Sequence, residues 1–346
     1  MDIPPQLIDS SARLALTGST AAIHRSFRAG HLVRLRRGYY VPTTDWISAK
    51  PHERHVLATA AVGLALDGPV FYGETAAVVL GLPTLRVPQF VDVATDVEGK
   101  TGRRPGTFTV LGGESVAEQA RNAGSYPLKF HLRRNAEPVC SGVFQSTGLV
   151  DTALDVMRHC PFSNALVVAD GVARLLAQQG QLAAGARLVD HPDVAAGLDG
   201  IRAVATQQRA IRVAAMAHAL AESAGESYSR AVIELLGFEQ PAQQKDFSDS
   251  SGFVGRSDFW WPEQRVVGEF DGRGKYLDEA LGGGDQAGAA VYREKLREDR
   301  IRDLGMKVVR WNWADLERPG RLRAKLLRAG LRPRPRGLPA DSGACF

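Results

Sequence analysis

The sequence predicts an α/β protein built of several domains. Its 346 residues are enough for roughly two or three domains with separate cores. Helical and strand-like patterns alternate along the chain, which favours sheets covered by helices. Two segments have patterns that can be interpreted further. One is a helix pair followed by a basic hairpin at the start, and the other is a helix and strand unit with acidic strands at the end.

The first segment begins with two expected helices. Residues 3–16 suggest the first helix and residues 17–30 the second, which is capped near its start and closed by Gly30. Residues 31–41 then have the pattern of a two-stranded hairpin. A helix pair followed by a basic hairpin is the layout of a winged helix-turn-helix, which we expect over residues 1–45.

This segment also carries a cluster of basic residues. Between residues 24 and 37 there are five arginines and no acid. Arg25 and Arg28 are three residues apart and share a helix face, while Arg36 and Arg37 lie at the expected hairpin tip. Arginines in such places can contact phosphates or guanine edges. The alternative is an ordinary solvated surface. The candidate nucleic-acid contacts of this segment are Arg25, Arg28, Arg34, Arg36 and Arg37.

A mixed α/β connector is expected over residues 46–224. The expected helices are residues 51–66, 74–80, 147–158 and 165–176, and the expected strands are residues 87–94, 107–111 and 128–132. The chain has no glycine-rich nucleotide-binding loop of either common spacing. His52 and His55 share a helix face, but without a third ligand we favour surface or packing roles for them.

The last third of the chain predicts a compact α/β unit. A helix over residues 225–237 starts with Glu226 and ends at Gly237. The expected elements that follow are strands at 243–247, 256–260 and 266–270, a charged helix at 292–304, a strand at 306–311 and a helix at 321–329. The order of helix, three strands, helix, strand and helix favours a short mixed sheet.

Two strands of this unit carry acids in apolar surroundings. Antiparallel pairing across the turn at residues 262–265 would place Asp258 near Glu269 and Asp271, which share a strand face. A carboxylate in an apolar strand is costly unless something compensates its charge. Mg²⁺ compensates well, because it prefers oxygen ligands. The alternative is an ordinary strand whose acids pair with Arg273 and Lys275.

Residues from about 226 to 331 resemble the very short patch repair (Vsr)-like endonuclease domains of unknown function, within the broad PD-(D/E)xK nuclease superfamily. The matching residues are 226–227, 229–230, 244, 255–259, 269–272, 275–276, 294–295, 297–300, 302, 305 and 308–310. The resemblance implies a restriction-endonuclease-like α/β domain, which we expect over residues 225–331. It implies an endonuclease that hydrolyses phosphodiester bonds, with DNA as the expected substrate.

The same resemblance implies a divalent metal, Mg²⁺ or Mn²⁺, held by Asp258 and Glu269. In the superfamily a Lys, or sometimes a Gln, two residues after the Glu positions the attacking water, and here Asp271 stands in that place. Lys275 and Gln244 are candidates for that role, and Asp271 is a candidate third metal ligand. Glu226 is a candidate additional acid. The alternative is a domain that kept its acids and lost cutting.

The front of the chain resembles the AbiEi-type antitoxins. The matching residues are 29–41, 72–82 and 147–154. These antitoxins are transcriptional regulators with an N-terminal winged helix in type IV toxin–antitoxin systems. The resemblance implies DNA as a partner and a cognate toxin as a further one. It also supplies a function of a different class, a DNA-binding repressor whose nuclease-like domain does not cut.

A second basic cluster lies near the end of the chain. Residues 318–336 carry eight Lys or Arg and no acid, which could grip a DNA backbone or be a solvated surface. The candidate nucleic-acid contacts of the last third are Arg297, Arg300, Arg321, Arg323 and Lys325. Residues 332–346 are expected to be a basic disordered tail.

The composition bounds the other possibilities. A net charge of +5 and a pI of about 9.2 favour an anionic partner. The three cysteines, Cys140, Cys160 and Cys345, are scattered, which argues against a disulfide framework or a zinc motif. The start of the chain lacks the pattern of a signal peptide, and apolar stretches such as residues 56–66 are too short to span a bilayer. We therefore expect a cytoplasmic protein with no membrane partner.

Overall fold

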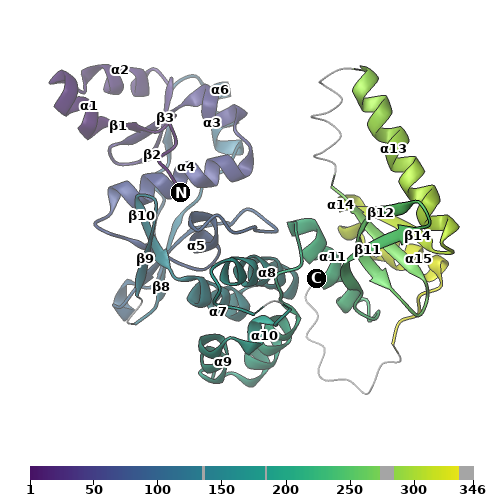
Figure 1. Ribbon diagram of the computed structural model, residues 1–346. Coiled ribbons are helices and arrows are strands. Elements are labelled where there is room, and N and C mark those ends of the chain that lie inside the picture. Colours follow the sequence, from purple (N-terminus) through teal and green to yellow (C-terminus); the bar gives the residue numbers. More distant parts are fainter. Residues whose placement is uncertain (135–136, 184, 273–283, 335–346) are drawn as a thin grey trace. The chain divides into compact units, whose positions relative to one another are not determined.

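The computed structural model of the chain confirms the α/β class, with helices around three sheets (Figure 1). It describes residues 1–134, 137–183, 185–272 and 284–334. Within those residues, no helix combines the length and the apolar character that crossing a membrane requires. The chain forms two compact units: unit 1 is Met1–Val172 with Val189–Val213, and unit 2 is Ala173–Leu188 with Ala214–Phe346. The four segments expected from the sequence, and the three boundaries between them, stay a prediction.

The first sheet of unit 1 is antiparallel, with the strand order β1-β3-β2-β7. Its elements are β1 (Ile8–Asp9), α1 (Ser10–Thr17), α2 (Ala21–Arg28), β2 (Leu32–Arg36), β3 (Tyr39–Pro42), α3 (Thr43–Ser48), β7 (Thr109–Val110) and α6 (Glu114–Asn122). The expected helix pair and hairpin are therefore both present, and β1 pairs with β3 along the edge of the hairpin.

The expected start of the first helix at residue 3 is wrong. The helix begins at Ser10, after the short strand β1. Asp9 caps it, because its Oδ1 accepts hydrogen bonds from the backbone N–H of Ser11 at 2.7 Å and of Ala12 at 3.2 Å. The dipeptide at residues 4–5 is Pro-Pro, whose locked φ and missing N–H groups do not suit a helix interior.

The second helix packs onto the hairpin through one apolar stripe. Ile23 and Phe27 of α2 are buried against Leu32 and Tyr40, and the rings of Phe27 and Tyr40 meet edge to face at 5.5 Å. The opposite face of α2 is left to solvent. Gly30, just past the helix, has a φ of 81° and lies so close to the residues after β7 that a Cβ there would meet the Leu111 carbonyl oxygen at 2.6 Å.

The second sheet of unit 1 is mixed, with the strand order β6-β8-β5-β4-β10-β9. Its strands are β4 (Val70–Phe71), β5 (Val91–Thr95), β6 (Gly102–Arg103), β8 (Leu128–Leu132), β9 (Pro138–Ser141) and β10 (Phe144–Thr147). The helices that the chain adds here are α4 (Pro51–Ala65), α5 (Gly73–Val79), η1 (Glu98–Lys100), α7 (Leu149–His159), α8 (Phe162–Gln178), η2 (Leu188–Asp190), α9 (Pro192–Asp199) and α10 (Val204–Met216).

Most long elements expected in this region are present, and most short strands were not expected. The four expected helices and the strand at residues 128–132 are confirmed within three residues at each end. The strand expected at residues 87–94 starts only at Val91, since Pro88 cannot donate a ladder hydrogen bond. His55 is buried, and its Nε2 lies 3.0 Å from the Phe90 carbonyl oxygen, so it has a packing role.

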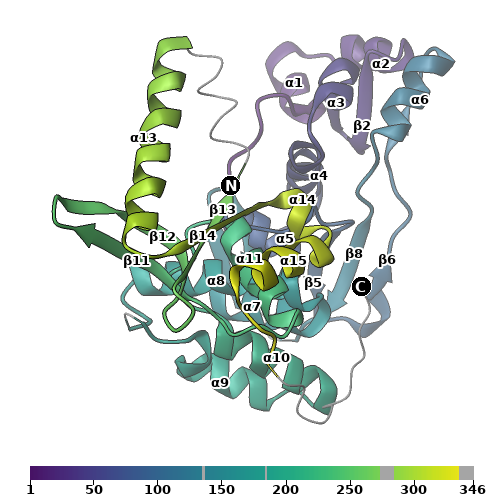
Figure 2. The ribbon, with the colours of Figure 1, turned by 90° about the vertical axis from the view of Figure 1, so that its right-hand side faces the viewer.

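Unit 2 has the expected order of helix, three strands, helix, strand and helix, with one unexpected short helix before the last helix. These elements are α11 (Ala224–Leu235), β11 (Ala242–Asp249), β12 (Gly252–Trp261), β13 (Val266–Asp271), α13 (Gly284–Asp303), β14 (Lys307–Asn312), α14 (Trp313–Leu316) and α15 (Pro319–Ala329). The sheet order is β11-β12-β13-β14, antiparallel except for the parallel pair β13 and β14. Figure 2 shows α13 standing beside β12 and β14, which it contacts.

The two faces of this sheet bury different side chains. Phe259, Trp261 and Val266 pack with α11 and α15 on one face, whereas Trp260 and Val267 pack with α13 on the other. Side chains alternate between faces along a strand, so Asp258 shares the α13 face with Trp260, and Glu269 shares it with Val267. The two acids therefore point toward the charged helix.

Candidate functional site

The hairpin of β12 and β13 brings Asp258 and Glu269 together as expected. The antiparallel register pairs Phe259 with Gly268. Asp258 comes just before Phe259 and Glu269 just after Gly268, so the two acids lie side by side on neighbouring strands. Asp258 Oδ2 accepts a hydrogen bond of 2.8 Å from the backbone N–H of Phe270, next to Glu269. The expectation that both acids lie on one sheet is met.

Two arginines hold Glu269. Its Oε1 accepts from Arg297 Nη2 of α13 at 2.6 Å, and its Oε2 lies 3.0 Å from Arg310 Nη2 of β14. Arg297 also binds Glu294 at 2.8 Å, and Arg310 contacts both Glu294 and Glu298. Burial raises the pKa of Glu269, and the arginines oppose that rise. Both oxygens of this carboxylate are thus occupied by cations of the protein itself.

Asp258 has less compensation for its charge. Burial raises its pKa to about 7, against the hydrogen bond from Phe270, and the negative charges of Glu226 and Glu269 raise it further. Near neutral pH this carboxyl group is therefore divided between its protonated and ionised forms. A protonated acid is one way in which the fold tolerates several buried carboxyl groups side by side.

Glu226 and Gln244 complete the cluster. Glu226 lies in the first turn of α11, where its Oε2 accepts from the Glu222 N–H at 2.9 Å and from Gln244 Nε2 at 3.1 Å. Its Oε1 accepts from the Ser223 hydroxyl at 2.8 Å, so the side chain serves as a helix cap. Burial raises the pKa of Glu226. Gln244 has a φ of 54°, a conformation uncommon for a residue with a side chain, and it lies on β11 between Gln243, which pairs with Phe259, and Lys245, which pairs with Ser257.

Of the two remaining catalytic candidates, one lies at the end of β13 and the other lies outside the described residues. Asp271 ends β13 opposite Asn312 and is half-buried. Lys275, the candidate for orienting water or phosphate, lies outside the described residues, and so does Arg273. The alternative in which those two cations pair with the hairpin acids therefore concerns residues outside the described ranges. The described cations that pair with Glu269 come from α13 and β14 instead.

This arrangement does not fit the expected Mg²⁺ or Mn²⁺. Among the described residues, no group of three or more His, Cys, Asp or Glu side chains is placed to hold a metal ion. Both Glu269 oxygens lie against arginines, and Glu226 is occupied as a cap. A divalent ion needs several free oxygen ligands, so Arg297 would have to leave Glu269 before the ion could bind.

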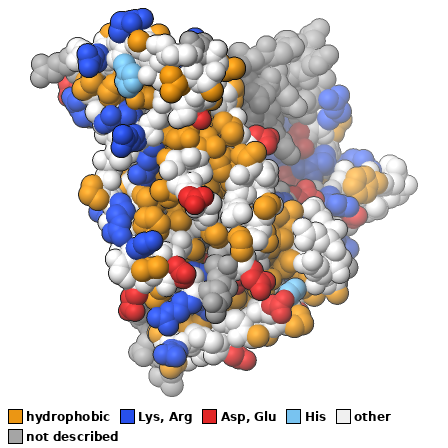
Figure 3. Space-filling model, turned by 90° about the vertical axis from the view of Figure 1, so that its left-hand side faces the viewer, with side chains coloured by type: hydrophobic (Ala, Val, Ile, Leu, Met, Phe, Trp, Pro, Cys, Tyr) orange, Lys and Arg blue, Asp and Glu red, His pale blue; other side chains and the backbone are white. Residues whose placement is uncertain are grey.

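The basic residues of the first segment fall into two groups. Arg25, Arg28 and Arg37 are exposed, and no carboxylate in the described part of the chain pairs with them. Arg34 is drawn inward, donating to Thr109 Oγ1 at 3.0 Å with its guanidinium 5.2 Å from the centre of the Phe27 ring. Figure 3 shows basic side chains at the end of unit 1 that carries α1 and α2.

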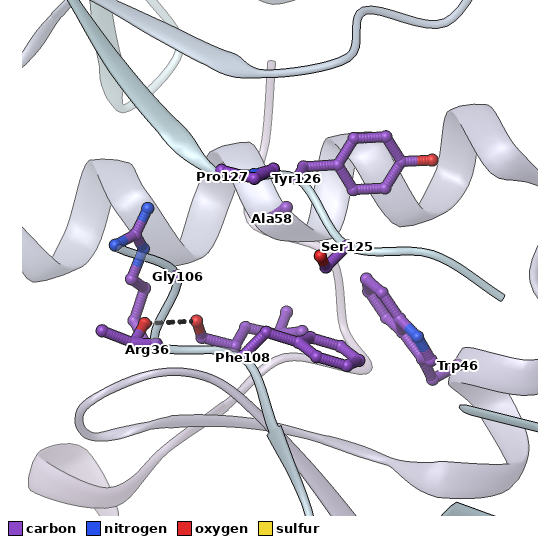
Figure 4. A pocket seen from close by; sticks show the side chains of 10 residues that line it. Arg36, Trp46, Ala58, Gly106, Phe108, Ser125, Tyr126 and Pro127 are labelled. Atoms are coloured by element: carbon purple, nitrogen blue, oxygen red, sulfur yellow. Dashed lines mark hydrogen bonds between the residues drawn. The ribbon is translucent and has the colours of Figure 1, made fainter. Parts of the chain in front are cut away.

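Arg36, expected at the hairpin tip, also turns inward. It lines a cavity of about 20 Å³ with Trp46, Phe108 and Tyr126 (Figure 4), and burial lowers its pKa. A volume of this size holds about one water molecule, which is too little for a substrate. Arg36 is therefore a less suitable phosphate contact than Arg37.

Most basic candidates of unit 2 are engaged within the fold. Arg300 makes two hydrogen bonds of 2.7 Å to Asp249, and Lys325 lies 2.7 Å from Asp315. Arg321 and Arg323 of α15 are exposed. Residues 335–346 of the expected tail lie outside the described residues.

Two residues of the site, Arg297 and Arg310, were not expected to bind Glu269. Arg297 was a candidate DNA contact, and Arg310 had no expected role. A signal for Arg310 exists in the topology, because parallel pairing of β13 with β14 sets Glu269 opposite Arg310. Predicting that Glu269 lies opposite Arg310 requires the order of the strands in the sheet, which the periodicity of a single segment does not give.

Comparison with known proteins does not identify a family for this chain. No protein-family model and no curated protein matches the chain. A similar solved structure is the crystal structure of the RV2827C protein from Mycobacterium tuberculosis, with a TM-score of 0.33 and 14% sequence identity. The match covers 71% of this chain and 84% of that one. A likeness at this level carries no argument about function, and the family resemblances expected from the sequence stay predictions.

Proposed function

We propose that this protein binds duplex DNA through α2 and the hairpin of β2 and β3. The observation that carries the proposal is the exposure of Arg25, Arg28 and Arg37 without a carboxylate partner in the described part of the chain. Three unpaired cations on one small segment form a surface that an anionic backbone would neutralise.

The connectivity of this segment supports a winged helix-turn-helix. The order is β1, α1, α2, β2, β3, and β1 pairs with β3. The second helix therefore lies next to a two-stranded hairpin, which would be the wing. Ile23 and Phe27 face the core, so Arg25 and Arg28 lie on the outer side of α2, which a DNA groove could receive. Arg37 at the turn of the hairpin would meet the adjacent phosphates.

Unit 2 would then serve as a nuclease-like fold that does not cut. The geometry that supports this is the pairing of Glu269 with both Arg297 and Arg310. A domain of this kind in a DNA-binding chain fits an antitoxin-like repressor, with a toxin as its further partner.

A metal-dependent endonuclease is the second candidate function. It is favoured by the crowding of Asp258, Glu226 and Glu269, and by the pKa of Asp258, which burial raises to about 7 with a smaller contribution from the two other acids. Clustered acids with raised pKa values are common at functional sites. In this candidate, release of Arg297 from Glu269 would precede metal binding.

Equilibrium binding of the full chain to a fluorescent duplex tests the first proposal. We expect Arg28→Gln to weaken binding severalfold and Arg202→Gln, which makes the same charge change at another exposed position of unit 1, to leave affinity close to wild type. Equal affinities in all three proteins would remove α2 from the interface.

A nuclease assay separates the two candidates. Plasmid, single-stranded DNA and RNA would each be incubated with the full chain in Mg²⁺, Mn²⁺ or EDTA. We expect no metal-dependent cleavage. Cleavage by the wild type that disappears in Asp258→Asn and Glu269→Gln would replace the first proposal with the second.

A further inference from the structure

Unit 1 carries another basic surface, away from the helix pair in sequence and built on different elements. The unit 1 basic patch consists of Lys129 and His131 of β8, Arg158 and His159 at the end of α7, and Arg209 of α10. Lys129 and His131 are two residues apart on one strand and share its face. His159 and Arg209 are exposed, so the patch is accessible to a ligand.

Contacts among these residues fix the patch. The rings of His131 and His159 have their centres 6.2 Å apart, and Tyr72 stacks on His131 at 4.5 Å. Arg209 Nη2 donates to the Arg158 carbonyl oxygen at 2.7 Å, where α7 ends. A guanidinium bound to the last carbonyls of a helix is held in place without losing its charge.

Three neighbouring acids already have partners, and one of these partners, His131, belongs to the patch itself. Asp92 binds His131 Nε2 at 2.6 Å, and Asp151 and Asp155 both pair with Arg133. Arg158 reaches Asp155 only at 4.0 Å. Lys129, His159 and Arg209 have no carboxylate partner within the part of the chain that the structure describes.

The electrostatics of His159 agree with this geometry. Partial burial lowers its pKa, and the positive charges of His131, Arg158, Lys129 and Arg209 lower it further. A site that disfavours one more positive charge is a site that an anion would stabilise.

We propose that the unit 1 basic patch binds a phosphate group, and that in the bound complex this phosphate belongs to the DNA backbone. The planar guanidinium of Arg209 offers several N–H donors in a fixed arrangement. Lys129 adds a compact positive charge, and His159 adds a ring N–H donor. Together these groups suit a tetrahedral oxyanion such as phosphate. The choice of DNA as the source rests on the proposed function, whereas the phosphate chemistry does not.

The test follows the ring resonances of His159 by NMR in the full chain, assigned with His159→Gln. Inorganic phosphate, ATP and a duplex are added in separate titrations. We expect phosphate and the duplex to shift the His159 resonances of the wild type and of Arg202→Gln, and to shift those of Arg209→Gln at least severalfold less. Arg209→Lys, which keeps the charge and loses the fork, should give an intermediate response.

The duplex titration also has a quantitative readout. Loss of one backbone contact in Arg209→Gln should lower the slope of log affinity against log salt by about 0.9. An unchanged slope with a normal phosphate response would leave the phosphate site standing and reject DNA as its source. The ATP titration then shows whether a free nucleotide supplies the phosphate.

Two results would overturn the phosphate site itself. One is no response of His159 to phosphate, ATP or the duplex. The other is an equal response in the wild type and Arg209→Gln, with both proteins folded by circular dichroism. A wild type that binds no DNA but still responds to phosphate through Arg209 would reject the proposed function alone.

Discussion

At the scale of single residues, the pKa of Asp258 makes the stability of the protein depend on pH. Its folded value of about 7 lies above the ordinary 3.8, so the folded chain keeps a proton that the unfolded chain releases. The resulting stabilisation is fully present below pH 3.8 and is lost as the pH rises through 7. The ionised form of this acid therefore destabilises the fold in alkaline solution.

Asp258→Asn removes the titrating group and with it this dependence of stability on pH. The amide oxygen of the asparagine can still accept the hydrogen bond from the backbone N–H of Phe270. We expect the variant to be more stable than the wild type at pH 8, with a gain that exceeds the gain at pH 5 by on the order of 2 kcal/mol. Urea unfolding at the two pH values measures the difference. A gain of the same size at both would mean that Asp258 titrates at its ordinary pKa.

Arg297 is expected to be the arginine on which the acid cluster depends most. Arg297→Gln leaves Glu269 with Arg310 alone, and we expect a loss of about 2 to 3 kcal/mol, less than for a fully buried pair that loses a partner. Arg302→Gln is the control on the same helix, since Arg302 is exposed and its partner Glu298 keeps its contact with Arg310. Thermal unfolding should show a loss of at most about 1 kcal/mol for that control.

The same pair of variants tests metal binding. If Arg297 excludes the ion, Mn²⁺ should stabilise Arg297→Gln and leave the wild type and Arg302→Gln unchanged in thermal unfolding. Equal stabilisation of all three proteins by Mn²⁺ would show that the arginine does not block the site.

The residues of the site differ in how far the sequence could predict them. Asp258 and Glu269 are joined by one tight hairpin, so alternation and a turn signal are enough to bring them together. Arg297 and Arg310 come from a helix and a strand that follow, and their contact with Glu269 depends on how α13 crosses the sheet. That placement is decided by packing between distant segments, which local periodicity does not contain.

At the scale of elements, the close contact between α11 and β13 rests on one glycine. A Cβ at Gly225 would lie 1.9 Å from Phe270 Cε1, so the helix can approach the strand only without a side chain there. Gly225→Ala should therefore displace Phe270 and lower the free energy of unfolding by about 1 to 3 kcal/mol.

The control for this variant is Gly320→Ala in the first turn of α15, where a Cβ would meet nothing within 4 Å. We expect it to be neutral or stabilising by up to about 1 kcal/mol. Urea unfolding of both variants checks the pair. A Gly225→Ala protein as stable as Gly320→Ala would show that Phe270 has room to move.

Elements were predicted best where one pattern is long. The charged helix, the hairpin of β12 and β13 and the long helix α4 all have uninterrupted periodicity. Strands of two residues such as β4 and β6 have no period to detect, and they exist because neighbouring strands supply their hydrogen bonds. The first helix starts at Ser10 rather than at residue 3, because the two prolines at residues 4–5 do not suit a helix interior.

At the scale of the whole molecule, the two units differ in the surroundings of their arginines. In unit 2, Arg297, Arg300 and Arg310 neutralise acids of the same unit. In unit 1, Arg25, Arg28 and Arg37 lie exposed without such partners among the described residues. The number of arginines alone does not distinguish the two uses, and the DNA contacts expected of unit 2 stay a prediction.

The salt dependence of duplex binding tests the central claim most directly. Affinity of the full chain for a duplex would be measured across salt concentrations for the wild type, for Arg25→Gln, Arg28→Gln and Arg37→Gln combined, and for Arg36→Gln as the inward-facing control. We expect the combined variant to lower the slope of log affinity against log salt by about 3, and Arg36→Gln to leave the slope close to wild type. A slope that is the same for all three proteins would contradict DNA binding through α2 and the hairpin.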